Sequence, residues 1–463
     1  MATDYLGNPL APETARQPGL VQAINDFVEG LLTYHPKAAH ILEAAQAAPG
    51  DTLVNAYAGF LTMFMESSAA PALARRHLDA ARRTAAQAPP RVQRHVDLLQ
   101  AWIADDIPAA LRSAEQLLDA FPRDLFAAKL AQYLHFNRGD HAAMLRIGLK
   151  ACRQAPDVAQ THGMLAFAYE QCHLLAEAEQ TARQALALDP REPWAQHALA
   201  HVLLTQGRIL EGIGFMESVR HHWDGLNSFI YTHNWWHLAL FYIARGRTDR
   251  ALQIYDRHVW GIVPEYAQDQ IGAVSLLVRL ELAQADVGDR WQPLADYLTA
   301  RADDVTQPFL SLQYLYGLAR AQRPQADQLL QALQRQAREA PAHSLPVWRD
   351  ITLPAAHGLL AHARGRPADA ARLLGSVLPQ LDAIGGSHAQ RDLFTQIQQD
   401  AALQAGHWRA AQQFLELRRL SDPDDAIALH ALVRVYTQLG IPEQAARTQQ
   451  RLAQAIAQGQ ALP

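Results

Sequence analysis

The stretch THGMLAFAYEQCHLLAEAEQTARQALALDP, residues 161–190, decides the fold. Ala166 and Ala178 fall where a small residue lets two helices approach closely, and Tyr169 fills a core position between them. Pro190 ends the second helix, because proline cannot continue a helical backbone. This pattern is typical of the tetratricopeptide repeat, so the stretch predicts two antiparallel helices that stack on similar neighbours.

The same period extends along the chain. Pro122, Pro156 and Pro190 each close a helical segment and lie about 34 residues apart, the length of one tetratricopeptide unit. Further units align through a turn glycine with a small residue five positions on. These glycines are Gly207, Gly246, Gly365, Gly406 and Gly440. The sequence therefore predicts an all-α fold, a tetratricopeptide-type α-solenoid.

Composition agrees with packed helices. Hydrophobic residues make up 49% of the chain and charged residues 19%, and β-branched residues are sparse, so we expect almost no strand. Residues 260–300 fit the repeat poorly. We expect one α-solenoid over residues 1–463, with irregular central units, curled around an interior pocket. A soft subdivision gives an N-terminal cap (1–50), regular repeats (51–260), irregular helical units (261–345), and C-terminal repeats with a cap (346–463).

Charge and sequence pattern exclude several classes of partner. A formal net charge of −5 does not supply the basic surface that a phosphate backbone needs, so we expect no nucleic-acid partner. No apolar run is long enough to cross a membrane, and the N-terminus lacks the pattern of a secretion signal. Two cysteines, Cys152 and Cys172, cannot form a disulfide framework. We expect a cytoplasmic protein without a membrane partner.

Histidine and tryptophan recur on one face of successive repeats. Nine of the 21 histidines lie between His162 and His258. Counting from the repeat landmarks places several of them on the stripe of each first helix that lines the concave side of such arrays. Peptide-gripping arrays carry lysine and asparagine there instead. The predicted stripe residues are His162 and Glu170, then Trp194, His197 and His201, then His233, Trp236 and His237.

Several strings together resemble the tetratricopeptide repeat protein 38 family. They are DYLGNPL, HGMLAFAYE, WAQHALAHVLLTQGRILEGI, HNWWHLALFYIARGRTDRALQIYD, LLVRLELAQADVGDRW and GGSHAQRD. The resemblance covers nearly the whole chain and implies a closed, irregular helical-repeat fold with a polar interior site. Its motif positions here are His162, His197, His201, His233, Asn234, Trp236, His237, His388, Gln390, Arg391 and Asp392. One departure is PFLSLQYLYGLARA, where Gln313 and Tyr314 replace an expected acidic or histidine-bearing helix.

The glycine-rich loop GGSHAQRD, residues 385–392, has two interpretations. Ser387 or Asp392 could cap the next helix, since glycines free the backbone before it. His388 and Arg391 are harder to assign to capping. If the solenoid curls enough to bring this loop to the concave histidines, the loop adds a cation and a carboxylate to their site.

A small-molecule pocket is the first functional hypothesis. Neutral histidines, Asn234 and Arg391 would hold a small polar, carboxylate-bearing molecule against Trp236 and Trp194. His162, Glu170, His388 and Asp392 complete the predicted ligand-binding set.

The same groups suit acid–base catalysis, because imidazole titrates near neutral pH and Arg391 would stabilise negative charge. The predicted catalytic residues are His197, His201, His233, His237 and Arg391. Paired histidines can also bind a metal, but the compact spacing of a strong zinc motif is absent, so we expect no metal and no cofactor. The sequence alone leaves open whether the protein is an enzyme.

A scaffold for protein partners is the alternative function. Tetratricopeptide arrays commonly bind peptides on the concave face, and fold alone says little of function. The substrate, the reaction class and the oligomeric state are not encoded in any recognisable pattern.

Overall fold

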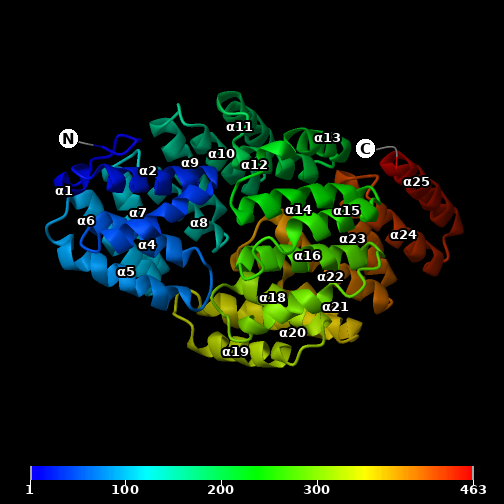
Figure 1. Ribbon diagram of the computed structural model, residues 1–463. Helices are drawn as coiled ribbons and strands as arrows, with labels where there is room; N and C mark the ends of the chain where they lie inside the picture. The colour runs from blue at the N-terminus through cyan, green and yellow to red at the C-terminus, as the bar shows by residue number, and fades with distance from the viewer. Residues whose placement is uncertain (1–2, 461–463) are drawn as a thin grey trace. The chain divides into compact units, whose positions relative to one another are not determined.

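The computed structural model describes residues 3–460, and within them it shows helices and one isolated bridge between Thr3 and Pro9 (Figure 1). The chain forms two compact units. The first comprises the residues up to Leu199 together with Trp223–Ile230, and the second comprises Ala200–His222 and the residues from Tyr231 onward. The boundaries fall inside α12 (Pro193–Thr205) and α14 (Ser228–Ala244). The predicted all-α solenoid is confirmed, while the predicted subdivision by repeat regularity stays a prediction.

Unit 1 is a series of helix pairs. Its helices are α1 (Pro12–Ala15), α2 (Pro18–Thr33), α3 (His40–Ala47), α4 (Thr52–Met63), α5 (Ala70–Ala85), α6 (Pro90–Ile103), α7 (Ile107–Ala120), α8 (Leu125–Phe136), α9 (His141–Gln154), α10 (Ala159–Gln171) and α11 (Leu175–Leu188), with a 3-10 turn at Pro36–Ala39. Aspartates begin four of them: the side chains of Asp51, Asp106, Asp124 and Asp140 each accept a hydrogen bond from the backbone in the first turn.

The repeat landmarks lie where the sequence predicts them. Pro122, Pro156 and Pro190 each follow the last residue of the second helix in a pair by two positions. Ala166 and Ala178 are fully buried between α10 and α11, as a close crossing requires. The local pattern of the repeat therefore determines the helix pairs.

A buried ionic cluster ties the N-terminal segment to unit 1. Arg91 on α6 forms ion pairs with Asp124 at 2.7 Å and with Asp4 at 3.2 Å. The side chains of all three residues are buried. His95, one turn further along α6, lies 2.8 Å from the same Asp124 carboxylate. The segment DYLGNPL is thus anchored through its aspartate to the repeats.

Unit 2 contains the remaining helices and the irregular turns. They are α13 (Ile209–Val219), α15 (Thr248–Ile254), α16 (Ala267–Leu282), α17 (Trp291–Leu298), α18 (Pro308–Arg320), α19 (Gln325–Glu339), α20 (Leu353–Ala363), α21 (Pro367–Val377), α22 (His388–Gln404), α23 (Trp408–Ser421), α24 (Ala426–Gln438) and α25 (Pro442–Gln460). π-Helical turns at Tyr255–Val259 and Val347–Thr352, and 3-10 turns at Arg220–His222, Thr299–Arg301 and Leu378–Ile384, interrupt the pairs. Of these turns only Thr299–Arg301 lies within residues 261–345, so the predicted confinement of irregular units to that range stays a prediction.

The C-terminal helices of unit 2 return to the turns that follow α12 and α14. Arg245, just after α14, forms a buried ion pair with Asp422 at 2.8 Å. Gly207 adopts a φ of +67° and approaches Ser421 so closely that an added Cβ would lie 1.9 Å from its carbonyl oxygen. Figure 1 shows α16, α18 and α20 in succession, and α22 also packs on α16. Residues far apart in the sequence therefore meet inside this unit.

Candidate functional site

Three histidines of unit 2 lie together. His233 and His237 are one helical turn apart on α14, so they share a face of that helix. The ring of His237 lies 4.9 Å from that of His233 and 4.5 Å from that of His201 on α12, between ring centroids. One nitrogen from each of the three rings lies within 4.8 Å of the others. The structure thus brings together three of the predicted site residues from two helices.

The interior of unit 2 disfavours the protonated form of His233. His201 and His237 are almost wholly buried. Burial, with a smaller effect of His201, lowers the pKa of His233 to about 3. A group with so low a pKa is a weak proton acceptor at neutral pH. Neutral imidazoles serve as hydrogen-bonding groups or as ligands of a metal ion.

Trp236 extends the cluster towards a buried cation. Its indole stacks on the His233 ring, with centroids 5.2 Å apart and planes 10° from parallel. The guanidinium carbon of Arg279 on α16 lies 5.3 Å from the centroid of the Trp236 ring. This is the geometry of a cation–π contact. The Trp236 indole therefore contacts both the Arg279 guanidinium and the His233 ring.

Arg279 is buried with only neutral hydrogen-bond acceptors. It is 2% exposed, and it donates to the hydroxyl of Ser275 at 2.5 Å and to the carbonyl of Ala389 at 2.6 Å. No carboxylate within residues 3–460 forms an ion pair with it. Burial lowers the pKa of the guanidinium to about 10, against the effect of the more distant Asp392. Arg279 therefore remains a cation at neutral pH without a directly bound counter-charge.

The loop 385–392 reaches this region through Arg279, whose acceptor Ala389 belongs to the first turn of α22. Ser387 caps that helix: its hydroxyl accepts from the backbone of Gln390, and the Gln390 side chain accepts from the backbone of Ser387. The capping role considered for Ser387 is confirmed.

The other predicted residues of the loop make contacts close by. Arg391 donates to the carbonyl of Gly386 and lies 3.4 Å from the ring of His388. Burial would raise the pKa of the Asp392 carboxyl, but Arg418 and Arg279 outweigh it and hold the pKa below its ordinary value. Asp392 accepts from Arg418 at 3.1 Å. The predicted ligand-binding roles of these three residues stay predictions.

Four of the predicted residues belong to unit 1. His162 is half-buried, and its ring lies 2.9 Å from the carbonyl oxygen of Pro156, at the turn before α10. Glu170 is fully buried and accepts from Gln171. Trp194 stacks on the ring of His197, with centroids 4.3 Å apart. Within this unit the structure brings together Trp194 and His197, but His162 bonds to its own turn.

Two side-chain amides and one indole contain buried polar atoms without a hydrogen-bond partner. Both amide atoms of Asn234, the indole nitrogen of Trp236 and the amide oxygen of Gln313 are buried without a hydrogen-bond partner in the described chain. Such groups are rare in folded proteins, because each loses its hydration without replacement. Three polar positions noted in the sequence thus retain unused hydrogen-bonding capacity.

Sequence reasoning missed Arg279 and Lys129. Lys129 lies 3.9 Å from the centroid of the Tyr34 ring, beside Trp194 in unit 1. Burial lowers its pKa and raises that of Glu192. Arg279 lies in LLVRLELAQADVGDRW, where an arginine within an apolar run was the available signal. Neither residue falls on the repeat stripe that was counted.

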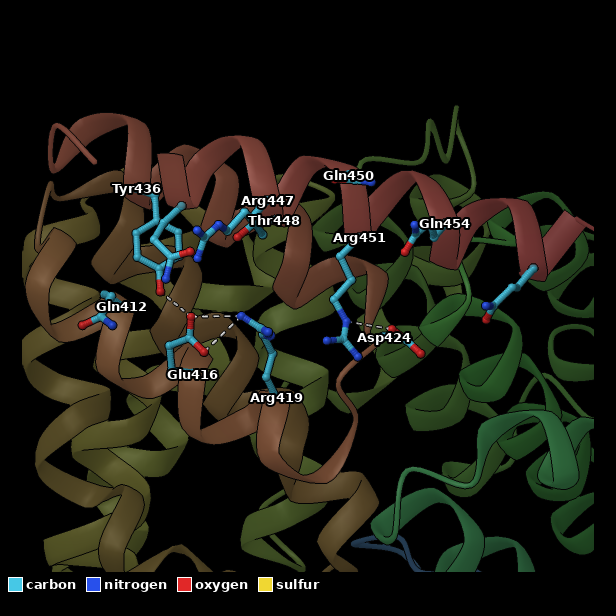
Figure 2. Close-up of a pocket in the computed structure, with 12 residues that line it drawn as sticks. Gln412, Glu416, Arg419, Asp424, Tyr436, Arg447, Thr448, Gln450, Arg451 and Gln454 are labelled. Carbon is cyan, nitrogen blue, oxygen red and sulfur yellow. Dashed lines mark hydrogen bonds and ion pairs between the residues drawn. The ribbon is translucent and has the colours of Figure 1, made fainter. Parts of the chain in front are cut away.

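A polar groove between α23, α24 and α25 is a separate feature of unit 2 (Figure 2). Its volume is about 840 Å³. Two of its arginines are paired: Arg419 binds Glu416 at 3.0 Å, and Arg451 binds Asp424 at 2.9 Å. In contrast to Arg279, these cations are already neutralised within the groove.

In the described part of the chain, no helix has both the length and the apolar character needed to span a membrane.

No protein-family model matches the sequence. Similar solved structures include the human IFIT1 dimer with m7Gppp-AAAA, which is 13% identical and has a TM-score of 0.41, with 88% of this chain and 91% of that chain covered. The Naa15/Naa10 complex bound to HypK-THB is 14% identical and has a TM-score of 0.26, with 94% of this chain and 63% of that chain covered. The TPR domain of P58(IPK) is 13% identical and has a TM-score of 0.22, with 80% of this chain and 98% of that chain covered. The likeness is to the helical-repeat fold and goes no further.

Proposed function

We propose that this protein binds a small anionic molecule, of the carboxylate-bearing kind, on its helical-repeat scaffold, with Arg279 as the cation and Trp236 as the apolar wall. The observation that carries the proposal is the buried guanidinium of Arg279, held over Trp236 with neutral acceptors only. Arg391, which the sequence favoured for this task, lies in the loop that supplies the Ala389 carbonyl to Arg279.

The physical argument rests on the cost of burying a charge. An ion taken out of water loses several kcal/mol of hydration even after relaxation, unless an opposite charge is near. Hydrogen bonds to Ser275 and Ala389 offset only part of that loss. A ligand carboxylate would supply the missing charge and match the planar guanidinium with two parallel hydrogen bonds.

Polar groups around Trp236 favour a ligand with more than one polar substituent. The Asn234 amide and the Trp236 indole nitrogen have unused donors, and the Gln313 amide has an unused acceptor. Each gains a hydrogen bond if the molecule presents a hydroxyl, amide or carboxylate to it. The tryptophan ring would meanwhile cover an apolar part of the molecule.

Other functional predictions stay open beside this one. Acid–base catalysis by the histidines and a peptide-binding concave face are proposals that the same purified protein can test. Membership of the tetratricopeptide repeat protein 38 family and a cytoplasmic location also stay proposals. One of the similar structures is named as IFIT1 with m7Gppp-AAAA, and the expected lack of nucleic-acid binding can be checked by filter binding with a short RNA.

The test of the main proposal is a thermal shift across a panel of small carboxylates and their amide analogues. A ligand at 100 times its dissociation constant adds about 2.7 kcal/mol of stability. We expect stabilisation by one carboxylate class, lost in Arg279→Met and retained in Arg320→Met, whose arginine is paired with Glu281. Equal shifts in the two variants, or none from any carboxylate in the wild type, would refute the proposal.

A further inference from the structure

The geometry points to a metal site: His201 on α12 and His233 and His237 on α14 bind one divalent transition-metal ion. This inference goes beyond the proposed anion binding and does not depend on it. It revises the expectation of no metal, which rested on the absence of a compact sequence motif.

The first support is distance. One nitrogen from each of His201, His233 and His237 lies within 4.8 Å of the others. Zinc binds histidine nitrogen at about 2.0–2.1 Å, so ligand nitrogens around a tetrahedral ion are separated by about 3.4 Å. Small rotations of three side chains close that difference without moving a helix.

The second support is helical spacing. Histidines four residues apart on one face of a helix can bind the same ion, as in the zinc-binding helix of metalloproteases. α14 supplies such a pair in His233 and His237. α12 supplies the third imidazole, His201, whose ring lies 4.5 Å from that of His237 between centroids.

The third support is the donor set. No carboxylate or thiolate belongs to this group. An all-nitrogen set suits zinc, cobalt, nickel or copper and does not suit magnesium or calcium, which prefer oxygen. The chemical class of the ion follows from that donor set.

The experiment uses full-length protein without a histidine tag. Metal content is measured by mass spectrometry, and chelator-treated protein is then titrated with Co²⁺, whose visible spectrum reports tetrahedral coordination. We expect close to one equivalent of metal per chain and a tetrahedral Co²⁺ spectrum that zinc abolishes. A folded wild-type protein that retains no metal and gives no such spectrum overturns the inference.

Variants locate the ion. His237→Gln and His201→Gln should each weaken binding at least 10-fold, while His162→Gln, whose ring lies on the Pro156 carbonyl, should bind as the wild type does. Helical circular dichroism checks that each variant is folded. His233→Gln should weaken binding and change the Co²⁺ spectrum. Unchanged binding in all three cluster variants would place the metal elsewhere and overturn the inference.

The two proposals fail separately. Arg279→Met should keep the metal and its spectrum while losing the carboxylate-dependent thermal shift. His237→Gln with normal carboxylate binding but no metal would support both sites as independent. A wild-type protein that binds metal but no carboxylate refutes only the proposed function.

Discussion

The guanidinium of Arg279 lies over the indole of Trp236, 5.3 Å from the ring centroid. The two residues are 43 positions apart in sequence, and they lie on α16 and α14. Since Arg279 also donates to the Ala389 carbonyl, one side chain connects the aromatic end of the histidine cluster to the start of α22.

Arg279→Met should leave the unliganded protein about as stable as the wild type, or up to about 1 kcal/mol more stable. A buried ion is often replaced by an apolar side chain without loss, because its hydration is no longer forfeited. Urea unfolding measures the difference. The matched control is Arg301→Met: Arg301 lies 5.3 Å from the Tyr314 ring but is paired with Asp304 at 3.1 Å.

Arg301→Met should lower the free energy of unfolding by about 3 kcal/mol, since removing one partner of a buried ion pair leaves the other charge poorly compensated. A similar loss in Arg279→Met would show that its neutral contacts already satisfy the cation.

Gly212→Ala should destabilise unit 2 by about 1–3 kcal/mol, because an added Cβ would lie 2.2 Å from the Phe241 ring where α13 crosses α14. Gly214→Ala, two residues along the same helix, meets nothing within 4 Å and should stabilise the protein by about 0.5 kcal/mol. Thermal unfolding of the pair measures both effects. The two changes in stability should have opposite signs. Equal signs would contradict the close crossing of α13 and α14.

Asp124→Asn should destabilise unit 1 by about 3 kcal/mol at neutral pH, because it breaks the buried contacts with Arg91 and His95. Burial alone would raise the pKa of Asp124, but Arg91 and His95 hold it well below the ordinary value. A carboxyl with a depressed folded pKa contributes stability above its unfolded pKa, and that contribution is lost as the pH falls below about 4.

Unfolding at pH 7, 5 and 3 should therefore show the wild type losing its advantage over the variant in acid. Asp157→Asn is the control, since its ion pair with Arg123 is exposed and should matter little. If the difference in free energy of unfolding between the wild type and Asp124→Asn stays constant with pH, the ionic role of Asp124 is contradicted.

Ser387→Ala should cost about 1 kcal/mol, the usual value of a helix cap, because it removes one half of the capping box at the start of α22. Fraying of that turn would also shift Ala389 away from Arg279, so the carboxylate affinity should fall. Ser376→Ala, which removes only an exposed bond to the Leu373 carbonyl, serves as the comparison. Equal carboxylate affinity in the two variants would separate the loop from the anion site.

The repeat alone determined much of this fold. Pro122, Pro156 and Pro190 end helices, the turn glycines adopt positive φ, and Ala178 and Gly212 mark close crossings. These outcomes follow from local backbone restrictions and from one small residue per crossing, which a sequence states directly. Helical spacing likewise placed His233 with His237, and His197 with His201, because residues four apart on a helix share a face.

Only the tertiary structure decided which faces meet. The distance from His201 to His237 depends on how α12 packs against α14, and Arg279 reaches Ala389 across 110 positions of sequence. Such long-range contacts depend on the crossing angles and irregular turns accumulated between them, which no local pattern encodes. For that reason Arg279 escaped the sequence analysis, and Arg391 was favoured for the anion-binding role that we propose for Arg279.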